Sequence, residues 1–439
     1  MLSSGNRPGY RRATGRVWRP VARQNVAALH QLKEAHAVPA FAKRMSQVRR
    51  SFIREILKVT ADPSIISFAG GLPKPDLFPT GPIADAAARV LADNGPAALQ
   101  YSVTEGEPAL RQWIADRYKT KRGLDIDPAT ILITNGSQQS LDLLGKVFLD
   151  PGDVVGVELP GYIGAIQAFS VFEPTFAGVP LGPEGPDIDR LTDVLTRQKA
   201  KMFYAVPNFQ NPSGLTYSLA ARRAVSEAMR VSDAVFVEDD PYGELRFKGE
   251  ALPPVSAFMT QDRYLLGTFS KIAAPGLRLG WVVADPDSLP KLVTAKQASD
   301  LHCSTLVQRI LVQYLADNDL DAHIATIKAA YGAQRDLMVE RIKAEFPEGV
   351  AYTEPEGGMF LWVTLPEGCS AFALFDLCIK EKVAFVPGEP FFVDGSGQRT
   401  MRLNFSNAEP ERIVEGIARM GRAIEKLLET PACPAGPSA

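Results

Sequence analysis

Cysteine and histidine are scarce in this chain of 439 residues, which contains four of each. The cysteines show neither metal-type spacing nor a paired framework, so we expect reduced thiols in a cytosol. They are Cys303, Cys369, Cys378 and Cys433. The histidines show no metal-ligand pairing, and no metal site is expected.

Long apolar runs and an excess of charge are also missing. No apolar run approaches about 20 residues, which excludes a membrane-spanning helix. The formal net charge of −2 offers no basic field for nucleic acid. A hydrophobic content of 46% and a charged content of 22% are typical of a globular protein, and the length is sufficient for two domains.

Acidic residues are absent from the first 23 positions, which instead carry several arginines. These are Arg7, Arg11, Arg12, Arg16, Arg19 and Arg23. No apolar segment of a secretory signal follows them. A transit peptide, a disordered arm and a start codon placed too far upstream are the alternatives. We favour the last two and expect residues 1–44 to form a basic arm outside the fold.

Short β-rich runs alternate with helical patterns through the middle of the chain. Strands are predicted at 131–134, 154–157, 202–206, 235–237, 264–266 and 281–284, with a helix beginning at Ser137 and another over 221–231. This alternation predicts a mostly parallel sheet covered by helices on both faces, with polar chemistry beyond the ends of the strands. The Pro- and Gly-rich pieces at 70–82 and 178–186 are interpreted as loops.

The pattern changes near residue 320. A helical stretch over 321–346 precedes β-rich runs at 359–363, 383–386 and 401–405. We therefore expect a large domain over 81–320 and a smaller α+β domain over 321–439. The segment 45–80 is expected to complete the smaller domain.

One lysine stands among hydroxyl and glycine residues directly after a predicted strand. The run at 267–280 reads GTFSKIAAPGLRLG, in which Thr268 and Ser270 precede Lys271, and Arg278 follows. Hydroxyls and a guanidinium can bind an anion, and the amine can form an imine with an aldehyde. Pyridoxal phosphate requires both features, although a lysine in such a loop is more often a solvated surface charge.

Further motifs follow in a fixed order along the chain. They read SFIRE at 51–55, SFAGGLP at 67–73, YSVTEG at 101–106, VPNFQNPSG at 206–214, VFVEDDPY at 235–242, EGGMF at 356–360 and MRLNFS at 401–406. Together they resemble the fold-type I, class I/II aminotransferases, and are most similar to the 2-aminoadipate and kynurenine aminotransferase subgroup. The resemblance covers about residues 45–425. It implies an α/β fold in which a mostly parallel, seven-stranded-type sheet is joined to a smaller α+β domain.

The resemblance implies roles for four residues around a pyridoxal phosphate ring. Lys271 is expected to bond covalently to the cofactor and to transfer protons during the reaction. Asp239, three residues before Tyr242, is expected to face the pyridine nitrogen, with Asp240 as the competing candidate. Tyr242 and Asn211 are expected to donate to the phenolate oxygen. Two of these motifs are also turn signatures: Asp-Asp-Pro, which begins at Asp239, and Asn-Pro-Ser-Gly, which begins at Asn211.

The remaining cofactor contacts are implied in the same way. A helix N-terminus at Ser137 and Gln138, together with Thr268, Ser270 and Arg278, is expected to bind the phosphate, because backbone N–H groups and the helix dipole favour an anion. Tyr162 is expected to stack on the ring. Tyr101 resembles a tyrosine that reaches the phosphate of the partner subunit, which implies a homodimer with shared active sites.

Arginines are the expected substrate contacts. Arg402 matches the residue that binds the substrate α-carboxylate, which suits a planar guanidinium, and Asn211 lies in the same set. Arg54 and Ser51 resemble positions that meet the distal group of the substrate. An arginine on an amphipathic helix is also commonly solvated.

The resemblance implies a cytoplasmic transaminase dependent on pyridoxal phosphate. It would move the α-amino group of an L-amino acid of the 2-aminoadipate, aromatic or branched-chain type to a 2-oxo acid, with 2-oxoglutarate as the expected acceptor. One alternative is the effector-sensing module of a transcription regulator, but residues 1–44 lack the apolar pattern of a three-helix DNA-binding domain. The other is a lyase or decarboxylase on the same fold. No nucleic acid or membrane partner is expected.

Overall fold

The computed structural model describes residues 40–46, 56, 62–430 and 433. The chain separates into two compact units, residues 1–46 and residues 47–439. The described part of the first unit contains the short 3-10 helix η1 (Lys43–Ser46). Almost all of the predicted basic arm therefore lies outside the described residues.

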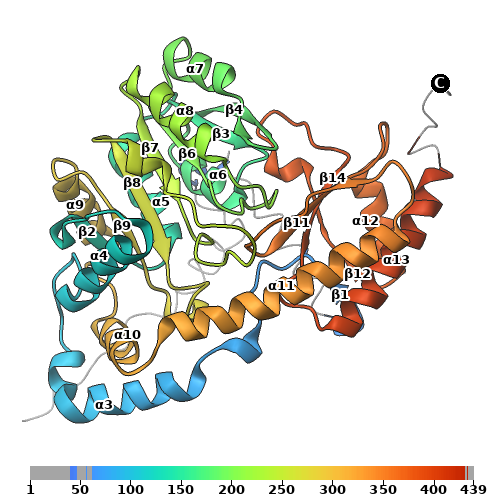
Figure 1. The fold of residues 1–439 in the computed structure, drawn as a ribbon. Helices are drawn as coiled ribbons and strands as arrows, with labels where there is room; N and C mark the ends of the chain where they lie inside the picture. The colour runs from blue at the N-terminus through green and yellow to red at the C-terminus, as the bar shows by residue number, and fades with distance from the viewer. Residues whose placement is uncertain (1–39, 47–55, 57–61, 431–432, 434–439) are drawn as a thin grey trace, which may run out of the picture. The chain divides into compact units, whose positions relative to one another are not determined.

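A mixed sheet of eight strands is the largest sheet of the second unit (Figure 1). Its order is β2 (Ile131–Thr134), β9 (Gly280–Val283), β8 (Arg263–Thr268), β7 (Val235–Asp239), β6 (Met202–Ala205), β3 (Val154–Leu159), β4 (Thr175–Gly182) and β5 (Gly185–Pro186). The neighbours from β8 to β4 are parallel, whereas β9 and β5 pair antiparallel to their neighbours. The mostly parallel sheet is thereby confirmed, with one strand more than the seven expected.

Strands β4 and β5 correct the interpretation of 178–186 as a loop. The segment is rich in glycine and proline, which predict turns, but it lies at the edge of the sheet, where both are tolerated. Edge strands need fewer apolar residues than central strands because they are less buried.

Both faces of this sheet are buried. Along β6, Met202 and Tyr204 pack into one apolar cluster, while Phe203 and Ala205 pack into another. Side chains alternate between the faces of a strand, so the two clusters lie on opposite faces. The covering helices include α5 (Ser137–Phe148), α6 (Ile163–Ser170), α7 (Ile188–Thr196), α8 (Leu219–Arg230) and α9 (Leu289–Asp300).

Helices α3 (Thr80–Ala98), α4 (Pro108–Arg122) and α10 (Thr305–Asp317) flank this part of the unit. Helix α3 packs against α10, as Figure 1 shows. None of the three was predicted from the sequence.

Two smaller sheets accompany the C-terminal half of the chain. One has the antiparallel order β10 (Ala351–Tyr352), β11 (Phe360–Thr364), β14 (Thr400–Asn404) and β13 (Val386–Pro387). In the other, β1 (Ile66–Ser67) pairs in parallel with β12 (Val383–Ala384). The expected strand over 383–386 is therefore two short strands in different sheets. Helices α11 (Leu320–Glu345), α12 (Ala371–Lys380) and α13 (Pro410–Leu428) pack beside them, while the domain boundaries at 80 and 320 stay a prediction.

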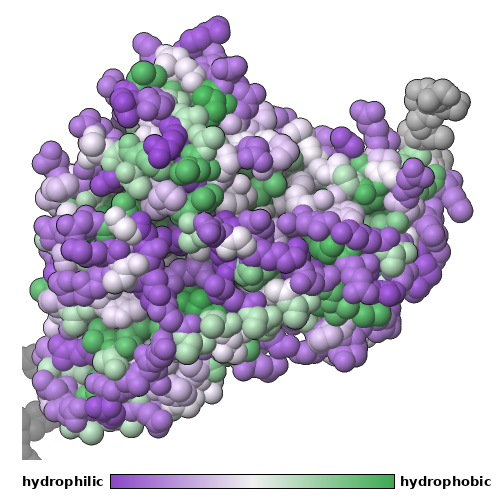
Figure 2. Space-filling view, viewed as in Figure 1, coloured by the Kyte–Doolittle hydropathy of each residue, from purple (hydrophilic) through white to green (hydrophobic). Residues whose placement is uncertain are grey.

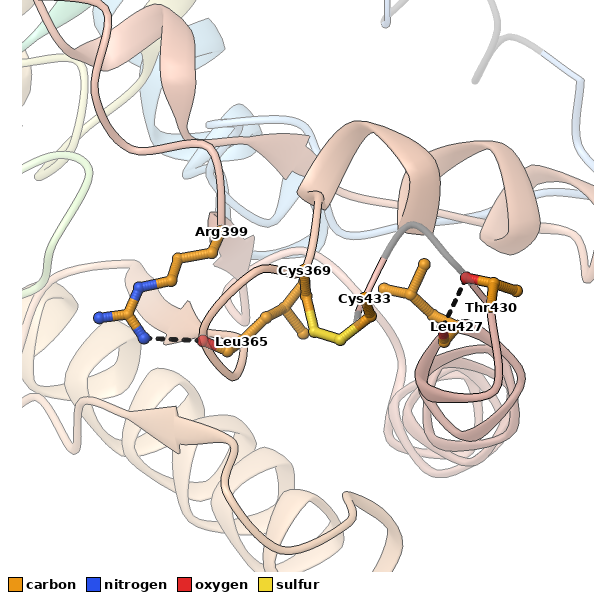
Figure 3. The surroundings of a disulfide bond; sticks show 6 residues. All are labelled: Leu365, Cys369, Arg399, Leu427, Thr430 and Cys433. Carbon is orange, nitrogen blue, oxygen red and sulfur yellow. Dashed lines mark hydrogen bonds between the residues drawn. A yellow bond between two sulfur atoms is a disulfide. The ribbon is translucent and has the colours of Figure 1, made fainter. Parts of the chain in front are cut away.

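Cys369 and Cys433 form a disulfide, so the expectation of reduced thiols is wrong for this pair (Figure 3). Cys433 follows α13, where backbone hydrogen bonds from Thr430 to Leu427 and from Cys433 to Thr430 turn the chain back. A separation of 64 residues carries no sequence signal for such a bond. The expectation is confirmed for Cys303 and Cys378, which are free and buried.

Polar and apolar residues intermingle on the surface. On the face seen in Figure 2, hydrophobic residues form scattered patches among hydrophilic ones. Of the helices within the described ranges, none is both long and apolar enough to cross a membrane.

Candidate active site

A cavity of about 370 Å³ opens where several strands of the large sheet end. It collects ten of the eleven residues expected to contact the cofactor, together with Arg402. The ten are Ser137, Gln138, Tyr162, Asn211, Asp239, Tyr242, Thr268, Ser270, Lys271 and Arg278. Residues that the sequence separates by more than 250 positions therefore share one site, as expected for the carboxyl ends of parallel strands.

Lys271 follows β8 and reaches into this cavity. Its Nζ donates to the carbonyl oxygen of Gly71 at 3.1 Å. Burial, with the neighbouring charges of Arg402 and Arg278, lowers the pKa of Lys271 to about 8. A substantial fraction of the amine is therefore neutral near physiological pH and can attack a carbonyl carbon.

Asp239 is the last residue of β7 and is only 2% exposed. Its Oδ2 accepts a hydrogen bond of 2.8 Å from the hydroxyl of Tyr204. Its Oδ1 is buried and has no hydrogen-bond partner among the described residues. Burial raises the pKa of Asp239 to about 7, and the Tyr204 hydrogen bond opposes that rise. A buried acceptor without a donor is costly, so this oxygen suits a ligand that brings an N–H group.

Asp240, the competing candidate, is already paired. It forms an ion pair of 3.2 Å with Arg122 and accepts from Asn208 Nδ2 at 2.9 Å. It is not among the described residues that line the cavity. The geometry therefore favours Asp239 as the carboxylate that faces a ligand.

Arg402, on β14, is 1% exposed and contacts only uncharged acceptors through its two terminal nitrogens. Nη1 donates to Asn211 Oδ1 at 2.8 Å, and Nη2 donates to the carbonyl oxygen of Ala69 at 2.7 Å. The guanidinium also lies 4.3 Å from the centre of the Phe360 ring. Burial lowers the pKa of Arg402 to about 10. A buried cation with neutral neighbours is a strong site for a carboxylate.

Two tyrosines complete the wall of the cavity. Burial raises the pKa of Tyr162 to about 12 and raises that of Tyr242 still further. Both phenols are therefore protonated and able to donate hydrogen bonds. The side chain of Asn211 interacts with that of Tyr242, so two of the predicted phenolate contacts lie side by side.

The start of α5 and Arg278 lie at one end of the cavity, the anion-binding end predicted from the sequence. Gly136 caps α5 with φ +76°, and a Cβ atom at that position would lie 2.8 Å from Arg278 Nη2. Arg278 Nη2 donates to the carbonyl oxygen of Asn135 at 3.2 Å, and Thr268 Oγ1 donates to Ser270 Oγ at 2.9 Å. Exposed backbone N–H groups at a helix start, beside a guanidinium, suit a phosphate dianion.

Three predicted residues are not among those that line the cavity. Tyr101 is 78% exposed, with its ring edge-on to that of His302 at 5.8 Å. Ser51 and Arg54 lie outside the described residues. Their expected roles, and the homodimer implied by Tyr101, stay predictions.

Gly71, Phe360 and Tyr204 are among the lining residues that sequence reasoning missed. Gly71 and Phe360 belong to motifs that the sequence analysis identified, but neither has a polar side chain that would indicate a role in the site. Tyr204 lies in a buried strand, where a tyrosine is most simply interpreted as a core residue. Its proximity to Asp239 depends on the pairing of β6 with β7, which the sequence does not specify.

Comparison with known proteins gives a consistent result. Residues 68–420 match the family Aminotransferase class I and II. The chain is 44% identical over 393 residues to a 2-aminoadipate transaminase of Thermus thermophilus, covering 89% of this chain and 97% of the relative. It is 41% identical over 395 residues to aromatic-amino-acid aminotransferase 1 of Thermococcus litoralis, covering 89% and 95%. The crystal structure of the Thermus thermophilus alpha-aminoadipate aminotransferase, complexed with N-(5'-phosphopyridoxyl)-L-leucine, matches with a TM-score of 0.82, 44% identity and coverage of 88% and 98%.

The fold is therefore that of a fold-type I enzyme, and its cavity is lined by a lysine, a carboxylate, hydroxyls and guanidinium groups. The chain belongs to the class I and II aminotransferases, and it is a transaminase dependent on pyridoxal phosphate. The cofactor, when bound, supplies an aldehyde for the amino group and a cationic ring that stabilises charge at the substrate α-carbon. The partnerless Oδ1 of Asp239 fits that ring, because it can accept the N–H of a pyridinium.

Proposed function

We propose that the cavity is the transamination site and that its residues divide the cofactor and substrate between them. Lys271 bonds to the cofactor aldehyde and, once released, carries a proton at Nζ. Asp239 accepts the ring N–H through Oδ1. The observation that carries this proposal is the partnerless, buried carboxylate oxygen in the same cavity as an amine of lowered pKa.

The position of each group in the cavity supports the other proposed cofactor contacts. Ser137, Gln138 and Arg278 bind the phosphate with the hydroxyls of Thr268 and Ser270. Tyr242 and Asn211 donate to the phenolate oxygen, and Tyr162 packs against the ring. Tyr101 contributes to the phosphate site of a second subunit in a homodimer, for which its exposure leaves room.

The substrates are an L-amino acid and a 2-oxo acid. Arg402 binds the α-carboxylate that all of them carry, because its guanidinium is buried among neutral acceptors. The names of the relatives support 2-aminoadipate and aromatic amino acids as donors, and branched-chain donors share the required α-carboxylate. We propose 2-oxoglutarate as the acceptor, with Arg54 and Ser51 meeting the distal group of the substrate.

A donor panel tests this proposal. The full-length protein is incubated with 2-oxoglutarate and 2-aminoadipate, kynurenine, phenylalanine or leucine, and glutamate formation is measured. We expect glutamate from at least one donor class, and none from Lys271→Ala. Formation of ammonia or carbon dioxide in place of glutamate would favour the lyase or decarboxylase reading instead.

A further inference from the structure

A buried polar network joins α9 to the turn at the start of α5. Lys296, on α9, is fully buried. Its Nζ donates to Gln139 Oε1 at 2.9 Å and to the two carboxylate oxygens of Asp300 at 2.9 and 3.0 Å. A buried ammonium is costly unless its donors are satisfied, so these acceptors fix its position.

Gln139 and Asp300 extend the network to Asn135. Asp300 Oδ2 accepts from Asn135 Nδ2 at 2.5 Å and from Gln139 Nε2 at 2.7 Å. Gln139 Oε1 also accepts the backbone N–H of Asn135 at 2.8 Å. Burial tends to raise the pKa of Asp300, but hydrogen bonds from Lys296, Gln139 and Asn135 and the charge of Lys296 bring it below its ordinary value. The carboxylate is therefore ionised and can accept all of these bonds.

Asn135 connects the network to the anion-binding end of the cavity. It directly precedes Gly136, the residue that caps α5. Its carbonyl oxygen accepts from Arg278 Nη2 at 3.2 Å. The backbone N–H, the carbonyl oxygen and the side-chain amide of Asn135 are thus all bonded, and both halves of the phosphate site are attached to this one residue.

We propose that Lys296 and Asp300 are positioning residues, which hold the turn over 135–138 and Arg278 in the geometry that binds the phosphate of the cofactor. Neither is among the described residues that line the cavity. Their opposite charges cancel, so the pair contributes geometry rather than a net field. This inference rests on the proposed phosphate site.

Two substitutions of opposite charge separate position from electrostatics. Lys296→Met removes a cation, and Asp300→Asn removes an anion. If only charge mattered, the first would weaken binding of pyridoxal phosphate and the second would strengthen it. If the pair positions the turn, both should weaken it, because each breaks hydrogen bonds that reach Asn135 or its partner Gln139.

Lys146 provides a matched control on the same pair of helices. Its Nζ donates to Asp142 Oδ2 at 2.6 Å and to Ser299 Oγ at 2.8 Å, so it also joins α5 to α9. These contacts do not include the 135–138 turn. Lys146→Met should therefore leave cofactor binding unchanged.

The measurement is the dissociation constant of the full-length chain, freed of cofactor, for pyridoxal phosphate and for pyridoxal, which lacks the phosphate. We expect Lys296→Met and Asp300→Asn to raise the constant for pyridoxal phosphate at least about tenfold, and that for pyridoxal less than about twofold. Since the Asp300 side chain is 24% exposed, Asp300→Asn remains a test if Lys296→Met does not fold.

Three results would overturn the inference: opposite effects of the two substitutions, equal losses for the two ligands, or no loss at all. Failure of the underlying site looks different. If the unsubstituted chain binds pyridoxal phosphate no more tightly than pyridoxal, the proposed phosphate site is itself wrong.

Discussion

Tyr204 donates a 2.8 Å hydrogen bond to Asp239 Oδ2, while Oδ1 of the same carboxylate has no partner among the residues that the structure describes. The phenol thus occupies one oxygen and leaves the other available for the proposed contact with the cofactor ring. It also limits how far burial raises the pKa of Asp239. A residue that resembles an ordinary core tyrosine therefore helps to keep this carboxylate ionised.

Tyr204→Phe should lower kcat/KM about tenfold and move the acidic limb of its pH profile to higher pH. Without the hydrogen bond, the pKa of Asp239 rises, and a protonated Asp239 cannot stabilise the cationic ring. The check is kcat/KM as a function of pH for both proteins. A uniform decrease with no displacement of the profile would limit Tyr204 to a packing role.

In the absence of cofactor, Asp239→Asn should increase the unfolding free energy of the chain at pH 8. The pKa of Asp239 is raised by burial from 3.8 to about 7, so the folded state binds the proton more tightly than the unfolded state. The contribution of this group to stability is present below about pH 4 and is lost as the pH rises through 7. The substitution should recover up to about 4 kcal/mol of unfolding free energy at pH 8 and much less at pH 4.

Denaturant unfolding of the cofactor-free chain at the two pH values measures this difference. Because Glu158 is also buried and has its pKa raised to about 7, only the comparison between Asp239→Asn and the unsubstituted chain isolates Asp239.

With cofactor bound, Asp239→Ala should instead cut turnover by orders of magnitude. If Asp240→Ala were the crippling change and Asp239→Ala mild, the assignment would be off by one residue.

Lys271→Ala should abolish turnover while retaining part of the cofactor affinity through the phosphate contacts. Reduction of the unsubstituted protein with borohydride should leave the cofactor mass on the peptide that contains Lys271, as read by mass spectrometry. Since the pKa of Lys271 is about 8, covalent attachment should accelerate as the pH rises toward that value. Cofactor mass on a different peptide would place the covalent site elsewhere.

Arg402 and Arg54 should differ in the range of substrates that need them. Arg402→Gln should impair every substrate, since all carry an α-carboxylate. Arg54→Ala should raise KM for 2-oxoglutarate and 2-aminoadipate far more than for leucine or phenylalanine, because unpairing a desolvated charge costs about 2–5 kcal/mol. Steady-state kinetics over the four compounds distinguish the two patterns, and equal losses for all of them would leave Arg54 a structural residue.

Mixed dimers should reveal whether Tyr101 acts across a subunit interface. Lys271→Ala and Tyr101→Phe proteins should each be impaired, and a mixture of the two should regain activity. In the heterodimer, one site combines an intact Lys271 with the Tyr101 of the other subunit. Absence of recovery after proven subunit exchange would argue against shared sites.

The residues that line the cavity were accessible from sequence because their chemistry is concentrated in short motifs at strand ends. The hydroxyls, Lys271 and Arg278 lie within one run, and the parallel-sheet rule brings that run to the others. Asp239 was chosen over Asp240 from its spacing to Tyr242, and the ion pair of Asp240 with Arg122 gives the physical reason.

Features that depend on how distant elements meet were not accessible. Tyr204 acquires its role from the pairing of β6 with β7, and Lys296 acquires its role from the packing of α9 on α5. The Cys369–Cys433 disulfide requires α13 to return the chain to the loop before α12. Local periodicity carries no information on any of these.

The hydrogen bonds of Arg402 constrain when the site can form during synthesis on the ribosome. This guanidinium is bonded to Asn211 and to Ala69, which are 191 and 333 residues away in sequence. At a synthesis rate of about 5–20 residues per second, the interval between the synthesis of Ala69 and that of Arg402 is on the order of half a minute. The pocket therefore assembles only after β14 has been synthesised, and a nascent chain stalled before β14 lacks the arginine that completes it.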